Sequence, residues 1–215
     1  DELLPRLDQL ASDYVLLAFR GLGFDATPGR VFSAAGESRA LGIAAAHGRL
    51  FARLLEMLTE DGFLGRRGED FEVLGPLGSP DLSRHDTELA RFDAVDGESH
   101  CLKRCGPELA RVLRGEQDPL HLLFPGGSLA EARRLYVESP YARTYNGALA
   151  ETLRLALDRA SANDRVRILE VGAGTGGTTG FLLPLLAPER TSYTFTDLSA
   201  LFLERAADRF ADFPF

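Results

Sequence analysis

The chain has 215 residues, of which 45% are hydrophobic and 26% charged, so it can bury one good core and has the composition of an ordinary globular protein. The formal net charge is −8, which disfavours nonspecific binding to nucleic acid or to anionic membranes, because both need a basic face. No window approaches the ~20 apolar residues of a membrane span.

The two ends and the two cysteines indicate where the chain comes from. It begins Asp1-Glu-Leu-Leu-Pro without a signal peptide or an initiator Met, and it ends abruptly at Phe213-Pro-Phe215, so we expect an excerpt from a longer polypeptide. Two cysteines in a chain of this size indicate a reduced, cytoplasmic protein. Cys101 and Cys105 lie at i, i+4, but a zinc site needs further ligands, so we expect two partly buried cysteines on a helix face.

The N-terminal third is predicted to be two short helices and a hairpin after one long helix. Leucines and Tyr14 recur at helical spacing over residues 3–20, which predicts an amphipathic helix. Helices are expected at 36–47 and 49–58. A β-hairpin is expected from 61 to 74, with residues 66–70 at its tip.

Helix, helix and hairpin is also the plan of a winged helix, which raises DNA binding as an alternative. Residues 37–72 contain five arginines against seven acidic residues, whereas a DNA reader would carry a positive recognition helix. The charges therefore favour a packing or lid element over a DNA-binding one.

The middle of the chain is predicted to be helical with breaks. A linker at 75–80 precedes helices at 81–95, 98–105 and 106–113, and residues 114–127 are expected to be irregular. Ser128 and Glu131 form a capping box for the next helix. Ser139 and Pro140 are typical of the start of a helix, which we expect to run to residue 159. Its packed face is predicted to hold Ala142, Tyr145, Leu149, Thr152 and Ala156.

The most informative stretch is a strand that runs into a glycine-rich turn. The apolar run 166–171 is typical of a strand buried on both faces of a parallel sheet. Gly172, Gly174 and Gly176 follow, and residues 178–183 can open a helix. A second strand, 192–196, ends at Asp197, which comes 21 positions after Gly176. Strand, glycine turn, helix and second strand form a nucleotide-binding unit in which the second acid meets ribose hydroxyls.

The acidic residue before the glycines points to the charge of the ligand. Glu170 would lie where a pyrophosphate normally binds, so it disfavours a nicotinamide-linked dehydrogenase that uses the same unit. A carboxylate there suits a ligand with a cationic end, such as the aminoacid part of S-adenosylmethionine (SAM). A glycine-rich turn without a ligand remains an alternative, as does a role for Asp197 as a helix N-cap or as a turn residue before Leu198 and Ser199.

These residues carry a resemblance to a known family. Residues 170–176 (Glu-Val-Gly-Ala-Gly-Thr-Gly) resemble motif I of class I SAM-dependent methyltransferases, and with the flanks 168–179 and 193–199 they resemble the C-methyltransferase domains of modular polyketide synthases. Residues 105–115 and 118–125 are similar to the helical lid that precedes the methyltransferase core in these domains.

The resemblance implies an α/β fold in two parts. A mostly helical lid with a winged-helix-like hairpin is expected over 1–160. The first βαβα part of a Rossmann-like, SAM-binding sheet is expected over 161–215, incomplete because such sheets need about seven strands.

The resemblance also implies which residues bind the cofactor SAM. They are Glu170, Gly172, Gly174 and Gly176 near the aminoacid and ribose, Asp197 at the ribose hydroxyls, Leu198 beside the adenine, and Tyr145 with Asn146 closing over the cofactor. Packing between helix and sheet is the alternative for Tyr145. We assign no catalytic residue, because the histidine and carboxylate pair that serves as base in this family is expected beyond Phe215.

The implied reaction is methyl transfer to the α-carbon of a β-ketoacyl chain on acyl carrier protein, with the other synthase domains as partners and neither nucleic acid nor membrane. Oxygen or nitrogen acceptors stay open. The alternative is a catalytically inactive pseudo-methyltransferase that serves as a structural domain of the synthase.

Overall fold

A computed structural model describes residues 2–92, 96–161 and 164–214. Packing divides the chain into two compact units, Asp1–Gly127 and Ser128–Phe215. This packing boundary precedes the predicted division between lid and core at residue 160, which concerns function and stays a prediction. None of the helices in the described ranges is long and apolar enough to cross a membrane.

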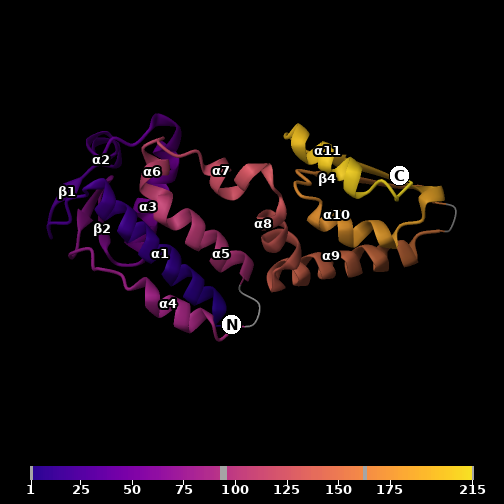
Figure 1. Cartoon of the computed structure of the whole chain (residues 1–215), viewed down its shortest axis with the longest axis horizontal. Helices are drawn as coiled ribbons and strands as arrows, with labels where there is room; N and C mark the ends of the chain where they lie inside the picture. Colours follow the sequence, from indigo (N-terminus) through magenta and orange to yellow (C-terminus); the bar gives the residue numbers. More distant parts are fainter. Residues whose placement is uncertain (1, 93–95, 162–163, 215) are drawn as a thin grey trace. The chain divides into compact units, whose positions relative to one another are not determined.

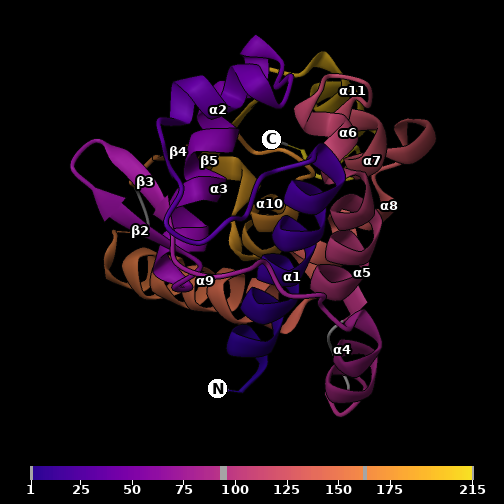
Figure 2. The same cartoon turned by 90° about the vertical axis from the view of Figure 1, so that its left-hand side faces the viewer.

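The N-terminal unit is helical with one small sheet (Figures 1 and 2). Its order is α1 (Leu3–Leu22), β1 (Val31–Phe32), α2 (Ala34–Ala40), α3 (Gly48–Glu60), β2 (Leu64–Arg67), β3 (Asp70–Val73), α4 (Leu82–Leu89), α5 (Asp96–Cys105), α6 (Leu109–Leu113) and α7 (Pro119–Leu123). Short 3-10 turns lie at Ala45–His47, Gly106–Glu108 and Pro125–Gly127. The sheet is antiparallel in the order β1-β3-β2. The long first helix and the hairpin are thus confirmed.

Three sequence predictions for this unit were wrong in detail. The helix expected over 36–47 is split into α2 and a 3-10 turn, because the chain turns at Gly42 with a φ of 71°. Residues 119–123, expected to be irregular, form α7, since Asp118 caps the N–H of Leu120. The helix expected over 81–95 ends at Leu89, and residues 93–95 lie outside the described part of the chain. Strand β1 had too few residues to be recognised.

Helix α1 organises the core of this unit because apolar side chains cover most of its circumference. Phe19 stacks on Phe51 of α3 with ring centroids 5.4 Å apart, and Leu55 and Leu58 are fully buried beside them. A second cluster joins Leu7, Leu10 and Tyr14 of α1 to Leu89 of α4. The helix ends at Gly23, whose φ of 83° lets the N–H of Phe24 bond to the carbonyl of Phe19.

The C-terminal unit carries a parallel strand pair with helices on one side. Its order is α8 (Ala130–Arg133), a π-helical segment η4 (Arg134–Glu138), α9 (Pro140–Arg159), β4 (Val166–Val171), α10 (Gly177–Leu182), 3-10 turns at Leu183–Leu185 and Pro188–Arg190, β5 (Thr191–Thr196) and α11 (Ala200–Arg209). β4 and β5 pair in parallel, with Ile168 opposite Tyr193. In Figure 1, α9 runs alongside α10. The cap of α9 is as predicted, because Ser139 Oγ accepts from the N–H of Ala142 at 3.2 Å.

The start of this unit differs from the prediction. Ser128 and Glu131 do not form the expected capping box: Ser128 Oγ accepts from the N–H of Ala130 at 3.2 Å, and Leu129 occupies the cap position of α8. The following turn widens into the π-helical segment η4.

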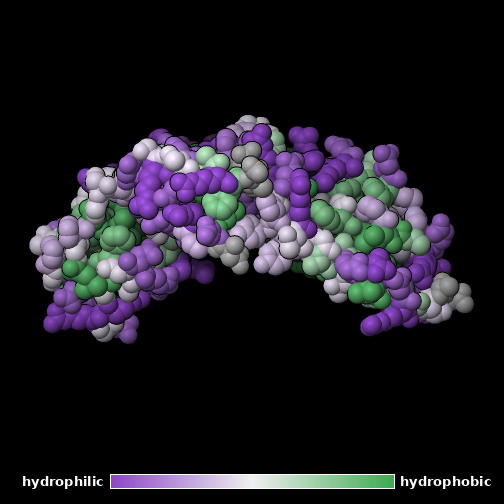
Figure 3. Space-filling model, turned by 90° about the horizontal axis from the view of Figure 1, so that it is seen from below, coloured by the Kyte–Doolittle hydropathy of each residue, from purple (hydrophilic) through white to green (hydrophobic). Residues whose placement is uncertain are grey.

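Two faces in the C-terminal unit also differ from the prediction. The packed face of α9 is shifted, because Asn146, and not Tyr145, lies toward α10. The half-buried positions of α9 are Pro140, Tyr141, Ala142, Asn146, Gly147, Ala150, Leu153 and Leu157. Strand β4 is covered on one face only, and Leu169 and Val171 on the other are 64% and 79% exposed. Figure 3 views the α9 side of this unit and shows green apolar surface among purple polar side chains.

The burial pattern of α3 provides a matched test of the N-terminal core. Leu55→Ala should lower the free energy of unfolding by about 2–5 kcal/mol, because Leu55 is fully buried and its removal leaves a cavity. Leu50→Ala on the same helix should change it far less, since Leu50 is 39% exposed. Urea unfolding followed by circular dichroism measures both variants, and equal losses would contradict this core.

Candidate functional site

The turn after β4 is built from three glycines in the left-handed region. The φ angles are 70° at Gly172, 55° at Gly174 and 69° at Gly176, a region in which other residues are strained. A side chain at Gly172 would enter open space, and one at Gly174 would meet only a backbone oxygen at 3.9 Å. A side chain at Gly176 would instead strike the Phe210 ring at 2.6 Å. The turn is therefore open at its first two glycines and packed at the third.

The carboxylate of Asp197 fixes this turn to the end of the neighbouring strand. Its Oδ2 accepts from the N–H of Gly174 at 2.9 Å, and its Oδ1 accepts from the N–H of Ser199 at 2.8 Å. The N–H of Ala173 donates to the carbonyl of Thr196 at 2.9 Å, which extends the pairing of β4 with β5 into the turn. Asp197 thus caps backbone, and each of its oxygens keeps a second lone pair for another donor.

Glu170 points to the α10 side of the sheet. Its Oε2 accepts from Thr179 Oγ1 and from the Tyr193 hydroxyl, both at 2.6 Å. Within residues 2–92, 96–161 and 164–214, Glu170 has no cationic partner. Burial raises the pKa of Tyr193, and the Glu170 carboxylate raises it further, so the phenol stays protonated as a donor. Glu170 therefore places an uncompensated negative charge behind the carboxyl end of β4.

The other predicted residues flank the turn in different ways. Leu198 follows Asp197, and its apolar side chain is fully exposed to solvent. Asn146 is tied down: its Oδ1 accepts from Thr178 Oγ1 at 2.8 Å, and its Nδ2 donates to the carbonyl of Tyr136 at 3.3 Å. Tyr145, the residue before Asn146 on α9, is 72% exposed. Asn146 therefore holds α9 against α10, whereas the exposed Tyr145 side chain does not contribute to this packing.

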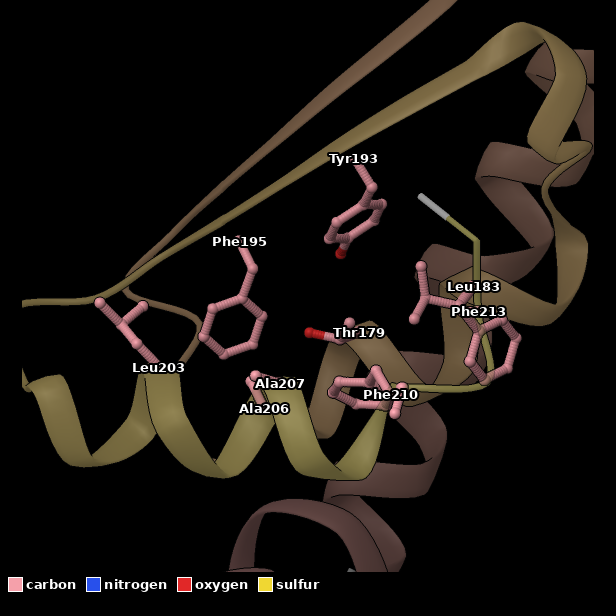
Figure 4. Close-up of a pocket in the computed structure, with 10 residues that line it drawn as sticks. Thr179, Leu183, Tyr193, Phe195, Leu203, Ala206, Ala207, Phe210 and Phe213 are labelled. Atoms are coloured by element: carbon pink, nitrogen blue, oxygen red, sulfur yellow. The ribbon is translucent and has the colours of Figure 1, made fainter.

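A cavity of about 460 Å³ lies behind the sheet, between β5, α10 and α11 (Figure 4). The hydroxyls of Thr179 and Tyr193 point into it among aromatic and aliphatic side chains. Its lining residues are Thr179, Leu183, Tyr193, Phe195, Leu203, Ala206, Ala207, Phe210, Ala211 and Phe213. None of the predicted cofactor-binding residues is among them, but the lining hydroxyls of Thr179 and Tyr193 both donate to Glu170.

Sequence reasoning missed two residues that shape the turn. Arg209, at the end of α11, donates from Nη1 to the carbonyl of Thr175 at 2.8 Å and to that of Gly176 at 3.2 Å. Gly177 begins α10 beside η4, where a Cβ would meet the carbonyl of Tyr136 at 2.8 Å. The doubled glycine, Gly176-Gly177, was the available signal for this close approach, whereas nothing local marks Arg209.

The two cysteines lie half-buried on α5, as predicted. Burial raises the pKa of Cys105 to about 11, and Cys101 adds to that effect. Within the described residues, no group of three or more potential ligands gathers around a point.

The geometry defines the class of protein. The C-terminal unit has a parallel strand, an open glycine turn with an acid before it, a helix and a second strand followed by an acid. These form the first part of a class I methyltransferase core. A family model described as "Methyltransferase domain" matches residues 169–215, which contain this turn.

Similar proteins show the family. The chain is 33% identical, over its whole length, to the non-reducing polyketide synthase ausA of Emericella nidulans. The CurJ carbon methyltransferase superposes over the whole chain with a TM-score of 0.92 and 34% identity. The citrinin polyketide synthase CMeT domain superposes over the whole chain with a TM-score of 0.81 and 26% identity. The chain belongs to the C-methyltransferase domains of polyketide synthases.

The match covers only part of these proteins. The chain spans 9% of the length of the Emericella nidulans synthase and 57% of each of the two solved chains. The predicted family and fold class are confirmed for the stretch that the chain covers.

The phenol of Tyr193 gives a pH-dependent test of the Glu170 contact. Because the folded state holds this proton more tightly than the unfolded chain, the stability it contributes is complete below the ordinary phenol pKa of about 10 and falls as the pH rises above it. Urea unfolding measured at increasing pH above about 10 should show that the free energy of unfolding falls less steeply with pH for Tyr193→Phe than for the wild type. The exposed control Tyr145→Phe should keep the wild-type slope. A wild-type slope in Tyr193→Phe would disprove the contact.

Proposed function

We propose that this chain is the lid and the first part of the SAM-binding core of an active C-methyltransferase domain in a cytoplasmic polyketide synthase. The domain transfers a methyl group from SAM to the α-carbon of a β-ketoacyl chain on acyl carrier protein. The observation that carries the proposal is the open backbone at Gly172 and Gly174 between two acidic residues at the strand ends.

The residues present fit the cofactor. Open space at Gly172 and Gly174 lets a ligand lie against the main chain, which any side chain there would obstruct. Asp197 can accept ribose hydroxyls with its remaining lone pairs while it holds the turn. The exposed Leu198 offers an apolar surface to the adenine. Glu170 supplies negative charge that favours a ligand with a cationic end.

The remaining two predicted residues act from α9. Asn146 fixes the start of α10 through Thr178, and with it the end of the glycine turn. Tyr145 has an exposed ring that can close over a bound cofactor.

The chemistry asks these residues mainly to position two reactants. SAM supplies a methyl group on a positively charged sulfur, which becomes a neutral thioether as the carbon–carbon bond forms. The turn and Asp197 would hold the bound donor for reaction with the acceptor carbon, and holding two reactants in position removes much of the entropic barrier. The α-proton of the acceptor passes to a base, a role that we assign to no residue of this chain.

Binding of S-adenosylhomocysteine tests the site directly. In isothermal titration of the full polypeptide that carries this chain, Gly174→Ala should weaken binding at least about tenfold, because its methyl group enters the ligand space and strains the turn by about 1–2 kcal/mol. Gly126→Ala is the matched control, since Gly126 has a φ of 61° and open space but lies in the other unit. Absence of binding by the wild type, or equal weakening by both variants, would refute the site.

Methyl transfer separates the enzyme from an inactive pseudo-methyltransferase. The full polypeptide is incubated with methyl-labelled SAM and a β-ketoacyl thioester of acyl carrier protein, and the product is located by NMR. We expect the label on the α-carbon. Label on oxygen or nitrogen would change the acceptor class, and binding without transfer would establish the structural role instead.

A further inference from the structure

We propose that Arg209 is a positioning residue for the cofactor-binding turn. This inference rests on the proposed function, since it concerns how the turn is held for its ligand. Arg209 lies at the end of α11, beyond the second strand, and acts through the backbone of the turn.

The contacts of Arg209 are with carbonyl groups of the turn. One nitrogen, Nη1, donates to the carbonyls of both Thr175 and Gly176, at 2.8 and 3.2 Å. The Gly176 carbonyl also accepts from the N–H of Gly180 at 3.1 Å, which is the first hydrogen bond of α10. The guanidinium therefore sits where the glycine turn becomes a helix and directs two consecutive carbonyls toward α11.

The neighbouring residues are shaped to admit this side chain. A Cβ at Gly180 would lie 3.1 Å from Nη2 of Arg209, so the glycine leaves room for the guanidinium. Phe210, the next residue, places its ring over Gly176 and lies 4.9 Å from the Arg209 guanidinium. Arg209 and Phe210 together form what we call the α11 clasp.

The charge of Arg209 is held without a counter-ion. Arg209 makes no ion pair with any residue of the described ranges, and its protein partners are neutral carbonyls. Burial lowers its pKa, and Arg133 lowers it further. Burying half of a cation costs free energy. The two hydrogen bonds to the carbonyls of Thr175 and Gly176 offset part of this cost, because they replace hydrogen bonds to water.

The clasp and Asp197 hold different backbone groups of the turn. Asp197 binds the N–H of Gly174, while Arg209 binds the carbonyls that follow one and two residues later. With both held, Gly172 and Gly174 keep their left-handed conformation with open space before them. Loss of Arg209 would remove the side-chain donor that holds the carbonyls of Thr175 and Gly176, so the ligand would have to order this end of the turn on binding.

Arginine variants test this role by S-adenosylhomocysteine titration of the full polypeptide. Arg209→Lys and Arg209→Gln should each weaken binding about tenfold, because both side chains are shorter than arginine and do not reach the position from which Nη1 holds the two carbonyls, and the glutamine is also uncharged. Arg205→Gln, an exposed position one turn earlier on α11, should leave the affinity unchanged. Ethylguanidinium added to Arg209→Ala should restore affinity, whereas ethylammonium should not.

A second readout does not need the ligand. The N–H of Gly174 donates to Asp197, and the N–H of Gly176 donates to the carbonyl of Ala173. Amide hydrogen exchange at these two positions should accelerate in Arg209→Lys and Arg209→Gln and not in Arg205→Gln. If the wild type does not bind S-adenosylhomocysteine, the proposed function is rejected. The exchange rates would still test whether Arg209 holds the turn. Wild-type exchange and affinity in the Arg209 variants would overturn the inference. Global unfolding without recovery in ethylguanidinium would overturn it as well.

Discussion

The carboxylate of Asp197 accepts hydrogen bonds from the backbone of both turns that leave the carboxyl ends of β4 and β5. Parallel strands place their carboxyl ends at the same edge of a sheet, but nothing in the strand ladder orders the loops beyond it. Asp197 supplies that order, since one oxygen holds Gly174 and the other holds Ser199. Without it, only the hydrogen bond from the N–H of Ala173 to the carbonyl of Thr196 would tie the open part of the turn to the second strand.

The glycines of this turn serve different physical purposes. Gly172 and Gly174 keep a left-handed backbone and leave space in front of it, whereas Gly176, Gly177 and Gly180 let aromatic, backbone and guanidinium groups approach closely behind it. A single stretch of chain thus has an open front and a tightly packed back. This division allows a ligand to touch bare main chain that is nevertheless held rigidly by α11, η4 and α10.

The two units are stabilised differently. The N-terminal unit has a contiguous core in which α1, α3 and the small sheet bury aromatic and leucine side chains. The C-terminal unit covers one face of its strand pair, and hydrogen bonds among Glu170, Thr179 and Tyr193 carry part of the packing there. Its other face exposes Leu169 and Val171, and parallel sheets normally bury both faces under helices.

The sequence by itself determined the two long helices, the hairpin, the two parallel strands and the family, because these depend on local patterns: the leucine periodicity of α1, the Ser139-Pro140 start of α9, and an acid followed by spaced glycines. It also placed Asp197 at the end of the second strand. Only the tertiary structure decided which face of α9 packs, that Glu170 bonds to Thr179 and Tyr193, and that Arg209 holds the turn. These depend on contacts between residues 9 to 34 positions apart, whose side-chain directions are fixed when helices pack on a sheet.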